Sequence, residues 1–344
     1  MRLPKAHLHL HFTGSMRHST LVELADEFGL RLPPALRSES PLAVPADQRG
    51  WFRFQRLYDA ARACVRSEAA MRRVVQEAAE DDAAEGSRRL ELQIDPTTYA
   101  PHVGGLTAAL EIVLDEARTA SAATGCTVAV VVAGSRLRHP LDGRALARLA
   151  ARYAGAGPGE VVGFGLSNDE RRGDTAEWAP AFAIAARAGL ALVPHGGELL
   201  GADHVRTVVD HLAPQRLGHG VRSAEDPAVL ADVVRRRIAL EVCPTSNVAL
   251  GVYADLAAVP LRTLLDAGAT VALGADDPLL FASRLVDQYR VARDVHGLDD
   301  AEIADLARAS ILVSTAGDSE KALLTAEVDA WLAAPGREAA PSTG

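Results

Sequence analysis

Three histidines alternate with leucines near the N-terminus, in the run His7-Leu8-His9-Leu10-His11. Residues two apart in a β-strand face the same side, so we expect His9 and His11 to point together, with His7 behind them. Two imidazoles on one face of a short strand form half of a metal site that needs further ligands from elsewhere in the chain. The alternative is a pair of structural histidines that are hydrogen-bonded at the end of a strand.

The elements that would position these histidines alternate along the chain. Short apolar runs rich in β-branched residues predict eight strands, at about residues 3–11, 90–94, 127–133, 161–165, 190–195, 216–218, 238–243 and 270–274. Segments of helical character lie between them, at about residues 71–85, 107–124, 143–154, 176–188, 202–212, 227–236 and 259–267. This alternation predicts a single α/β domain, a (β/α)8 TIM barrel over residues 1–334, with a doubly wound open sheet as the alternative.

Composition and charge limit the classes of protein to consider. The 344 residues are 48% hydrophobic with a formal net charge of −9, and no dense basic block stands out. A nucleic acid or an anionic membrane surface requires such a block, so neither is expected as a partner. The three cysteines, Cys64, Cys126 and Cys243, are too scattered and too few for a disulfide framework. No signal peptide or membrane span is evident, which predicts a cytoplasmic protein, and residues 335–344 are expected to form a disordered tail. The sequence gives no signal for an oligomeric state.

The connection between the first two predicted strands is far longer than an ordinary crossover. It spans about residues 15–89 and contains a predicted helix at about residues 18–28 and the aromatic group Trp51, Phe52, Phe54 and Tyr58. It leaves from the carboxyl end of the first strand, where the active sites of barrels lie. We therefore expect a helical lid or pocket wall in which Trp51 and Phe52 contact the substrate. The alternative is that these aromatic residues form a small core beneath the insertion.

Polar residues cluster immediately after most of the predicted strands. Beyond the first strand, these groups are Ser167-Asn168-Asp169-Glu170, His195-Gly196-Gly197-Glu198, Gly218-His219-Gly220, Cys243-Pro244-Thr245-Ser246-Asn247 and Asp276-Asp277-Pro278. The carboxyl ends of parallel barrel strands share one face, so all of these groups are expected to converge there. Such convergence indicates a catalytic site rather than isolated structural histidines.

The converging donors suit a divalent metal ion. Imidazoles and a carboxylate, without cysteine, are typical ligands of a catalytic Zn²⁺ that keeps one position for water. The expected ligands are His9, His11, His195 and Asp276. One Zn²⁺ is predicted, with other divalent metals as alternatives, and such an ion lowers the pKa of a water molecule toward about 7. Glu198 is expected to donate a proton rather than to bind the metal, and His219 to bind or deprotonate that water.

Five motifs, met in order from about residue 3 to about residue 330, resemble those of the adenosine deaminase family. They are Pro4-Lys5-Ala6-x-Leu8-His9-Leu10-His11, His195-x-Gly197-Glu198, Gly218-His219-Gly220, Glu241-Val242-Cys243-Pro244-x-Ser246-Asn247 and Asp276-Asp277-Pro278. The resemblance implies a zinc-dependent barrel hydrolase of purine metabolism. Such an enzyme replaces the 6-amino group of an adenosine-type nucleoside with oxygen and releases ammonia.

By position, the resemblance also implies a role for each residue of the site. The zinc ligands would be His9, His11, His195 and Asp276. Glu198 would protonate purine N1 while hydroxide attacks C6, and His219 would orient and activate that hydroxide. Asp277 would accept a hydrogen bond from protonated N7. The family's backbone donor to N3, usually a glycine, falls at Asn168, and asparagine tolerates a left-handed backbone.

Three positions depart from the family pattern. Thr13 stands where adenosine deaminases carry an aspartate and adenine-specific relatives a glutamate, so a free 5′-hydroxyl would lose a charge-assisted hydrogen bond. Either adenosine binds with a remodelled ribose contact, or the substrate is modified at the 5′ position, as in 6-amino-6-deoxyfutalosine or methylthioadenosine. His7 replaces a glutamate and is expected to support the core rather than bind metal, and Gln93 replaces a common arginine without an evident reason. Adenine deamination, another amidohydrolase reaction and a non-catalytic binding barrel are further alternatives.

Overall fold

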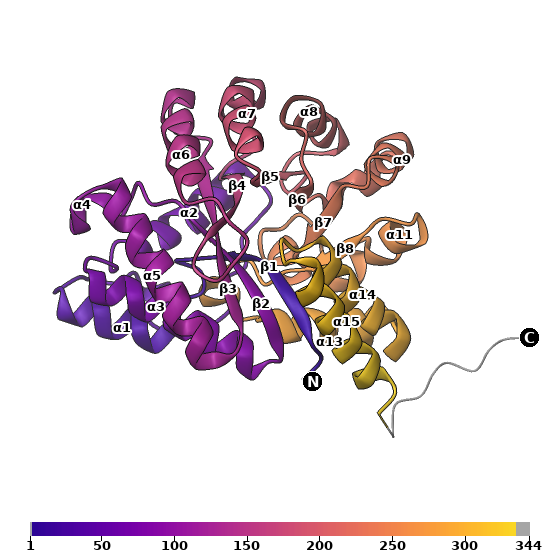
Figure 1. Ribbon diagram of the computed structural model, residues 1–344. Helices are drawn as coiled ribbons and strands as arrows, with labels where there is room; N and C mark the ends of the chain where they lie inside the picture. The colour runs from indigo at the N-terminus through magenta and orange to yellow at the C-terminus, as the bar shows by residue number, and fades with distance from the viewer. Residues whose placement is uncertain (1, 335–344) are drawn as a thin grey trace, which may run out of the picture.

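The computed structural model describes residues 2–334, in which eight parallel strands follow one another in chain order. The strands are β1 (Lys5–His11), β2 (Ser87–Ile94), β3 (Thr127–Ser135), β4 (Val161–Ser167), β5 (Ala191–Gly196), β6 (Arg216–His219), β7 (Ala239–Val242) and β8 (Val271–Leu273). The edges β1 and β8 meet at a bridge between Leu10 and Asp276, where the Asp276 N–H donates to the His9 carbonyl at 3.0 Å. The strands thus close into a barrel ringed by helices (Figure 1). The (β/α)8 prediction is confirmed, and the open doubly wound sheet is wrong.

Helices connect the strands on the outside of the barrel. They are α1 (His18–Glu27), η1 (Pro34–Leu36), α2 (Gln48–Arg62), α3 (Glu68–Ala84), α4 (Ala100–Val103), α5 (Leu106–Thr124), α6 (Pro140–Arg152), η2 (Thr175–Trp178), α7 (Ala179–Arg187), α8 (Ala202–Leu212), η3 (Val221–Glu225), α9 (Pro227–Arg235), α10 (Pro244–Ala249), η4 (Leu256–Ala258), α11 (Leu261–Asp266), α12 (Pro278–Phe281), α13 (Leu285–Asp294), α14 (Asp300–Val313) and α15 (Asp318–Leu332). Each predicted helix has a counterpart, whereas the α-helices α2, α4, α10, α12, α13, α14 and α15 were not predicted. The predicted tail at 335–344 lies outside the described residues.

The long connection between β1 and β2 contributes α1, η1 and α2 before the crossover helix α3. Asp47 caps α2 by accepting a hydrogen bond from the Gly50 N–H at 2.8 Å. On the inner side of α2, Phe54 stacks on Phe281 of α12, with ring centroids 5.6 Å apart. Because α12 follows β8, this contact places α2 over the carboxyl end of the barrel. The insertion therefore forms a wall beside the site rather than a separate unit.

A chain of buried ionic side chains crosses the barrel interior. Arg89 and Glu91 on β2 are linked by a 2.9 Å hydrogen bond, and Arg216 on β6 bonds the other oxygen of Glu91 at 2.6 Å. Arg216 also donates to Glu241 on β7 at 2.7 Å. Strands β2 and β6 are not neighbours in the sheet, so these bonds must pass through the inside of the barrel. This series of ion pairs ends at Glu241, whose carboxylate also contacts His9 of β1 at 2.9 Å.

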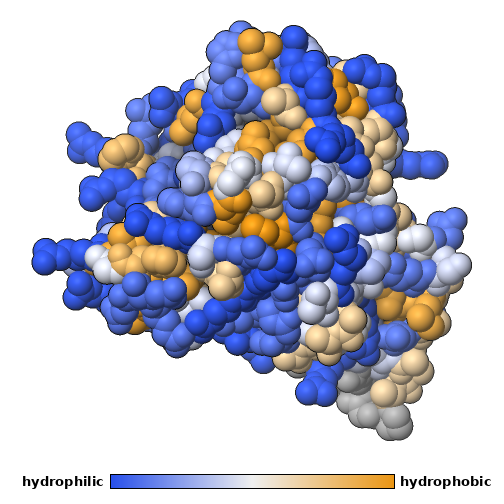
Figure 2. All heavy atoms as spheres, turned by 60° about the vertical axis from the view of Figure 1, so that its left-hand side comes forward, coloured by the Kyte–Doolittle hydropathy of each residue, from blue (hydrophilic) through white to orange (hydrophobic). Residues whose placement is uncertain are grey.

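Within residues 2–334, no helix is long and apolar enough to cross a bilayer. Figure 2 shows a face covered mainly by hydrophilic residues, with hydrophobic ones in separate patches.

Candidate active site

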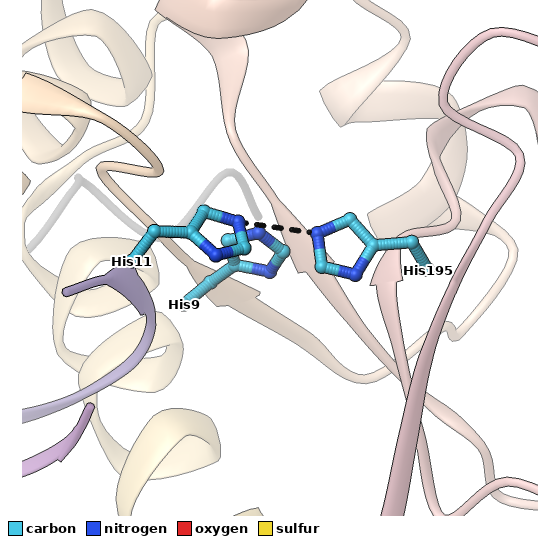
Figure 3. Close-up of side chains that lie close together, drawn as sticks. All are labelled: His9, His11 and His195. Carbon is cyan, nitrogen blue, oxygen red and sulfur yellow. Dashed lines mark hydrogen bonds between the residues drawn. The ribbon is translucent and has the colours of Figure 1, made fainter. Parts of the chain in front are cut away.

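The four predicted metal ligands lie together at the carboxyl end of the barrel. His9 and His11 come from β1, His195 from β5, and Asp276 from the turn after β8. Oδ1 of Asp276 lies 3.2 Å from Nε2 of His11 and 3.6 Å from Nε2 of His9, and Nε2 of His195 lies 3.3 Å from Nε2 of His11 (Figure 3). The three imidazoles point toward one another, as two-residue spacing on a strand predicts for His9 and His11.

His9 is oriented by a carboxylate behind it. Its Nδ1 lies 2.9 Å from Oε2 of Glu241 and donates its proton there, while its Nε2 makes no hydrogen bond within residues 2–334. A histidine that donates one ring proton to a carboxylate presents the lone pair of its other nitrogen, which is the usual arrangement of a metal-binding imidazole. The His9 ring is fully buried, so an unpartnered Nε2 would be costly without a ligand.

His7 does not point the same way as His9 and His11, contrary to the expectation that it lies behind them. Its Nδ1 bonds Asp82 on α3, a helix outside the barrel, at 2.9 Å. Its Nε2 accepts a hydrogen bond from the Ala275 N–H at 3.1 Å, in the seam between β1 and β8. The register of β1 shifts between His7 and Leu10, so the strict alternation of side chains is interrupted there.

The electrostatics of the cluster favour a bound cation. Burial and the neighbouring His9 and His11 hold the pKa of His195 well below its usual range, so its imidazole is neutral. Burial lowers the pKa of His9, but the neighbouring carboxylates of Asp276 and Glu241 outweigh burial and raise it to about 10. Burial raises the pKa of Asp276, yet the neighbouring imidazoles of His11 and His9 bring it well below its usual range. The buried carboxylates therefore stabilise a positive charge within the cluster. Carboxylate oxygens and imidazole nitrogens are also the ligands that suit Zn²⁺.

Glu198 reaches the same site on a loop held by Glu170. The Glu170 carboxylate accepts hydrogen bonds from the backbone N–H groups of Glu198, Leu199 and Leu200, at 3.2, 2.8 and 2.8 Å. Burial, together with the nearby carboxylates of Asp276 and Glu170, raises the pKa of Glu198 well above its usual range. The protonated form of its carboxyl group is thereby favoured, as a proton donor requires.

His219 faces Glu198 across the cavity. Its Nε2 lies 3.6 Å from Oε1 of Glu198 and makes no hydrogen bond within residues 2–334. The side-chain amide of Asn247 lies 3.5 Å from Nδ1 of His219, on the other side of the ring. Burial lowers the pKa of His219 to about 4. His219 adopts a left-handed backbone with φ of 61°, an uncommon conformation that tends to occur at functional sites.

A cavity opens in front of the cluster. Three of the metal residues (His11, His195 and Asp276) line it together with Glu198 and His219. Asp277, Asn168 and Trp51, which were predicted to contact the substrate, also lie in the lining. Asn168 has φ of 81°, which fits the left-handed backbone that its residue type tolerates. Two predicted contact residues are missing from the lining, which also contains further residues of α2 and of the strand ends.

Two predicted substrate contacts are not part of the cavity lining. Phe52 is 65% exposed and is not among the residues that line the cavity. Trp51, Phe54 and Tyr58 do line it, because residues three or four apart share one face of α2. Thr13 is fully buried behind the wall, where its hydroxyl lies 2.5 Å from the hydroxyl of Tyr99.

Several site residues were not assigned a role from the sequence. They are Glu241, Glu170, Gln55, Arg62, Tyr99 and Arg136. Arg136, at the end of β3, donates to the carbonyl of His195 and to Thr175. The sequence could have pointed to Glu241, because a carboxylate inside an apolar strand needs a buried partner. It could also have pointed to Glu170, which belongs to the polar group after the fourth predicted strand.

Known proteins that resemble this chain include several deaminases. The family model described as adenosine deaminase matches residues 4–331. A putative adenosine/adenine deaminase of Streptomyces virginiae is 58% identical over 331 residues, which cover 96% of this chain and 97% of that protein. An adenine deaminase of Agrobacterium fabrum is 35% identical over 310 residues, covering 90% and 93%. The crystal structure of an adenine deaminase from Arthrobacter aurescens matches with a TM-score of 0.87 and 29% identity, over 96% of this chain and all of that one.

Proposed function

This chain belongs to the adenosine deaminase family and is a hydrolytic deaminase, and from that premise we propose that it deaminates a 6-aminopurine nucleoside with one bound Zn²⁺. The observation that carries the proposal is the grouping, around one cavity, of a buried histidine–aspartate cluster with Glu198 and with a His219 Nε2 that has no hydrogen-bond partner within residues 2–334. The expected products are the inosine-type nucleoside and ammonia.

The metal would be held by the four clustered side chains of His9, His11, His195 and Asp276. When bound, the ion would lower the pKa of a water molecule next to purine C6, so that hydroxide is available at neutral pH. Glu241 would keep the Nδ1 proton of His9 and so present Nε2 to the ion.

Proton transfer would be carried out by Glu198 and His219. Glu198 would donate its proton to N1, which makes C6 more electrophilic as water adds there. His219 would accept the proton that the attacking water releases, through its Nε2. His219 would then pass this proton to the 6-amino group, and the C6–N bond would break to release ammonia. The hydroxyl left on C6 would return its proton to Glu198 as C6 becomes a carbonyl.

The remaining purine contacts would fix the ring in the cavity. Asp277, which follows the metal ligand Asp276, would hydrogen-bond N7. The backbone N–H of Asn168 would donate to N3. Trp51 and Phe54 on α2 would cover the site from the side of the insertion and exclude water from it.

A panel assay tests the proposed substrate class. Ammonia release is measured with adenosine, 2′-deoxyadenosine, adenine, methylthioadenosine and 6-amino-6-deoxyfutalosine, each at equal concentration. We expect at least one nucleoside to exceed adenine in kcat/KM by at least about tenfold, because contacts to the sugar add to transition-state binding. Faster turnover of adenine, or no turnover of any 6-aminopurine, would overturn the nucleoside assignment.

A second candidate substrate is a nucleoside with a larger group at the 5′ position. Thr13 supports it, since its hydroxyl is bonded to Tyr99 behind the cavity wall and cannot replace a carboxylate as partner of a free 5′-hydroxyl. Gln55 and Arg62 on α2 also line the cavity and present N–H donors. In the panel, adenosine should then lose to methylthioadenosine or 6-amino-6-deoxyfutalosine by at least about tenfold.

A further inference from the structure

We propose that Gln93 is a specificity-determining residue, whose side-chain amide binds hydroxyl groups of the sugar attached to N9. The inference rests on the proposed function, because it requires a nucleoside substrate. Gln93 lies on β2, one strand away from the His-x-His strand, and it lines the cavity. The sequence alone did not indicate a functional role for Gln93.

The side-chain amide of Gln93 is buried and has no hydrogen-bond partner among the described residues. The residue is only 1% exposed, yet neither Oε1 nor Nε2 makes a hydrogen bond within residues 2–334. Leaving the donor and the acceptor of a buried amide unpaired is unfavourable, because both have lost their hydrogen bonds to water. A fully buried amide that borders a cavity is therefore expected to bind something that enters the cavity.

The backbone fixes where this amide points. Gln93 pairs in register with His11, and its carbonyl accepts a hydrogen bond from the Phe12 N–H at 2.8 Å. Register partners in a parallel sheet project their side chains to the same side, so Gln93 faces the inside of the barrel like His11. Its side chain is thus directed at the space in front of the metal cluster.

The order of strands around the barrel identifies the part of the substrate that faces Gln93. In the proposed complex, N1 faces Glu198 after β5, N3 faces Asn168 after β4, and N7 faces Asp277 after β8. Around the purine rim, N1 is followed by N3, then N9, then N7. Around the barrel, β5 is followed by β4, then by β3, β2 and β1, and then by β8 (Figure 1). The N9 substituent therefore lies toward β3, β2 and β1, with Gln93 on the middle strand.

The chemistry of the amide matches a sugar. A carboxamide offers one acceptor oxygen and two N–H donors, and each hydroxyl of a ribose can both donate and accept. A pair of adjacent hydroxyls can thus satisfy Oε1 and Nε2 together. Adenine has no hydroxyl there and would leave the amide without these partners.

Gln93→Leu tests the inference, because leucine is similar in size and cannot form hydrogen bonds. The substrates are adenosine, 2′-deoxyadenosine, 3′-deoxyadenosine and adenine, and kcat/KM, metal content and thermal midpoint are measured. We expect kcat/KM for adenosine to fall about 10–100-fold. The fall should be clearly smaller for the deoxynucleoside that lacks the bonded hydroxyl, and adenine hydrolysis should change little. The thermal midpoint should not fall, because no hydrogen bond within the protein is lost.

Three results would overturn the assignment of Gln93. They are an unchanged kcat/KM for adenosine, an equal fall for all substrates including adenine, and a lowered thermal midpoint with loss of metal. The wild-type enzyme separates this inference from the proposed function. If it deaminates adenine but neither adenosine nor its deoxy analogues, the nucleoside function itself fails; if it deaminates adenosine, only the behaviour of Gln93→Leu decides the inference.

Discussion

Glu170 holds the loop that carries the proton donor Glu198, so replacing Glu170 should slow the catalysed reaction. The carboxylate accepts three backbone N–H groups, those of Glu198, Leu199 and Leu200. Hydrogen bonds to a charged acceptor contribute about 1.5–3 kcal/mol each, but three bonds to one carboxylate are not additive. We expect Glu170→Ala to lower the free energy of unfolding by about 3–5 kcal/mol. The released loop should misplace Glu198 and lower kcat by about 10²-fold.

The assay is ammonia release at matched metal content, combined with urea unfolding. Glu170→Gln keeps the shape and one acceptor oxygen, so its loss of kcat should be smaller than that of Glu170→Ala. Asp169→Asn is the matched control, since this neighbouring carboxylate bonds Arg171 rather than the loop of Glu198. It should leave kcat close to that of the wild type.

A Glu170→Ala enzyme that folds, binds metal and keeps the wild-type kcat would refute this reasoning. An equal loss of kcat in Asp169→Asn would also contradict it, because the effect would then not depend on the hydrogen bonds to the loop.

Three further predictions concern the buried carboxylates and the cluster. Glu241→Gln should weaken metal binding about 10–100-fold, as measured by competition with a chelator, because the partner of His9 is altered; unchanged affinity would contradict its role. Burial raises the pKa of Glu91, but the guanidinium groups of Arg216 and Arg89 outweigh burial and lower it from 4.5 to about 2. Because the pKa of Glu91 is lower in the folded state than in the unfolded state, its ionisation contributes about 3 kcal/mol to the free energy of unfolding above about pH 4.5. This contribution is lost as the pH falls toward about 2. In urea unfolding, the free energy of unfolding of Glu91→Gln should therefore fall less steeply with decreasing pH than that of the wild type. Removal of metal with a chelator should abolish activity, and Zn²⁺ should restore it; full activity of the metal-free protein would count against the cluster.

Much of the fold could be predicted because each strand is a short apolar run between polar or glycine-rich segments. The polar residues that follow the strands, such as His195 and Asp276, could be assigned to one face because barrel geometry requires it. The helices after β8 were not predicted. They lie beyond the last strand, where the alternation of elements no longer supplied a reason to expect them.

The contacts that orient the site were less accessible to sequence reasoning. Glu241 and Arg216 act through bonds that cross the barrel interior, and no local pattern indicates which side chains meet there. The choice between Phe52 and Phe54 depended on the phase of α2, and the helix was not predicted, so its inner face was not known. Thr13 was recognised as a departure, but its bond to Tyr99 joins residues 86 positions apart in the chain.

The most direct test of the central claim is the kinetics of Glu198→Gln with its metal content measured in parallel. Glutamine keeps the shape of the side chain but removes the acidic proton. We predict one zinc ion for each chain in both proteins, and a fall in nucleoside deamination of about 10³-fold in the variant. A Glu198→Gln enzyme that deaminates nucleosides at the wild-type rate, with its metal bound, would contradict the account.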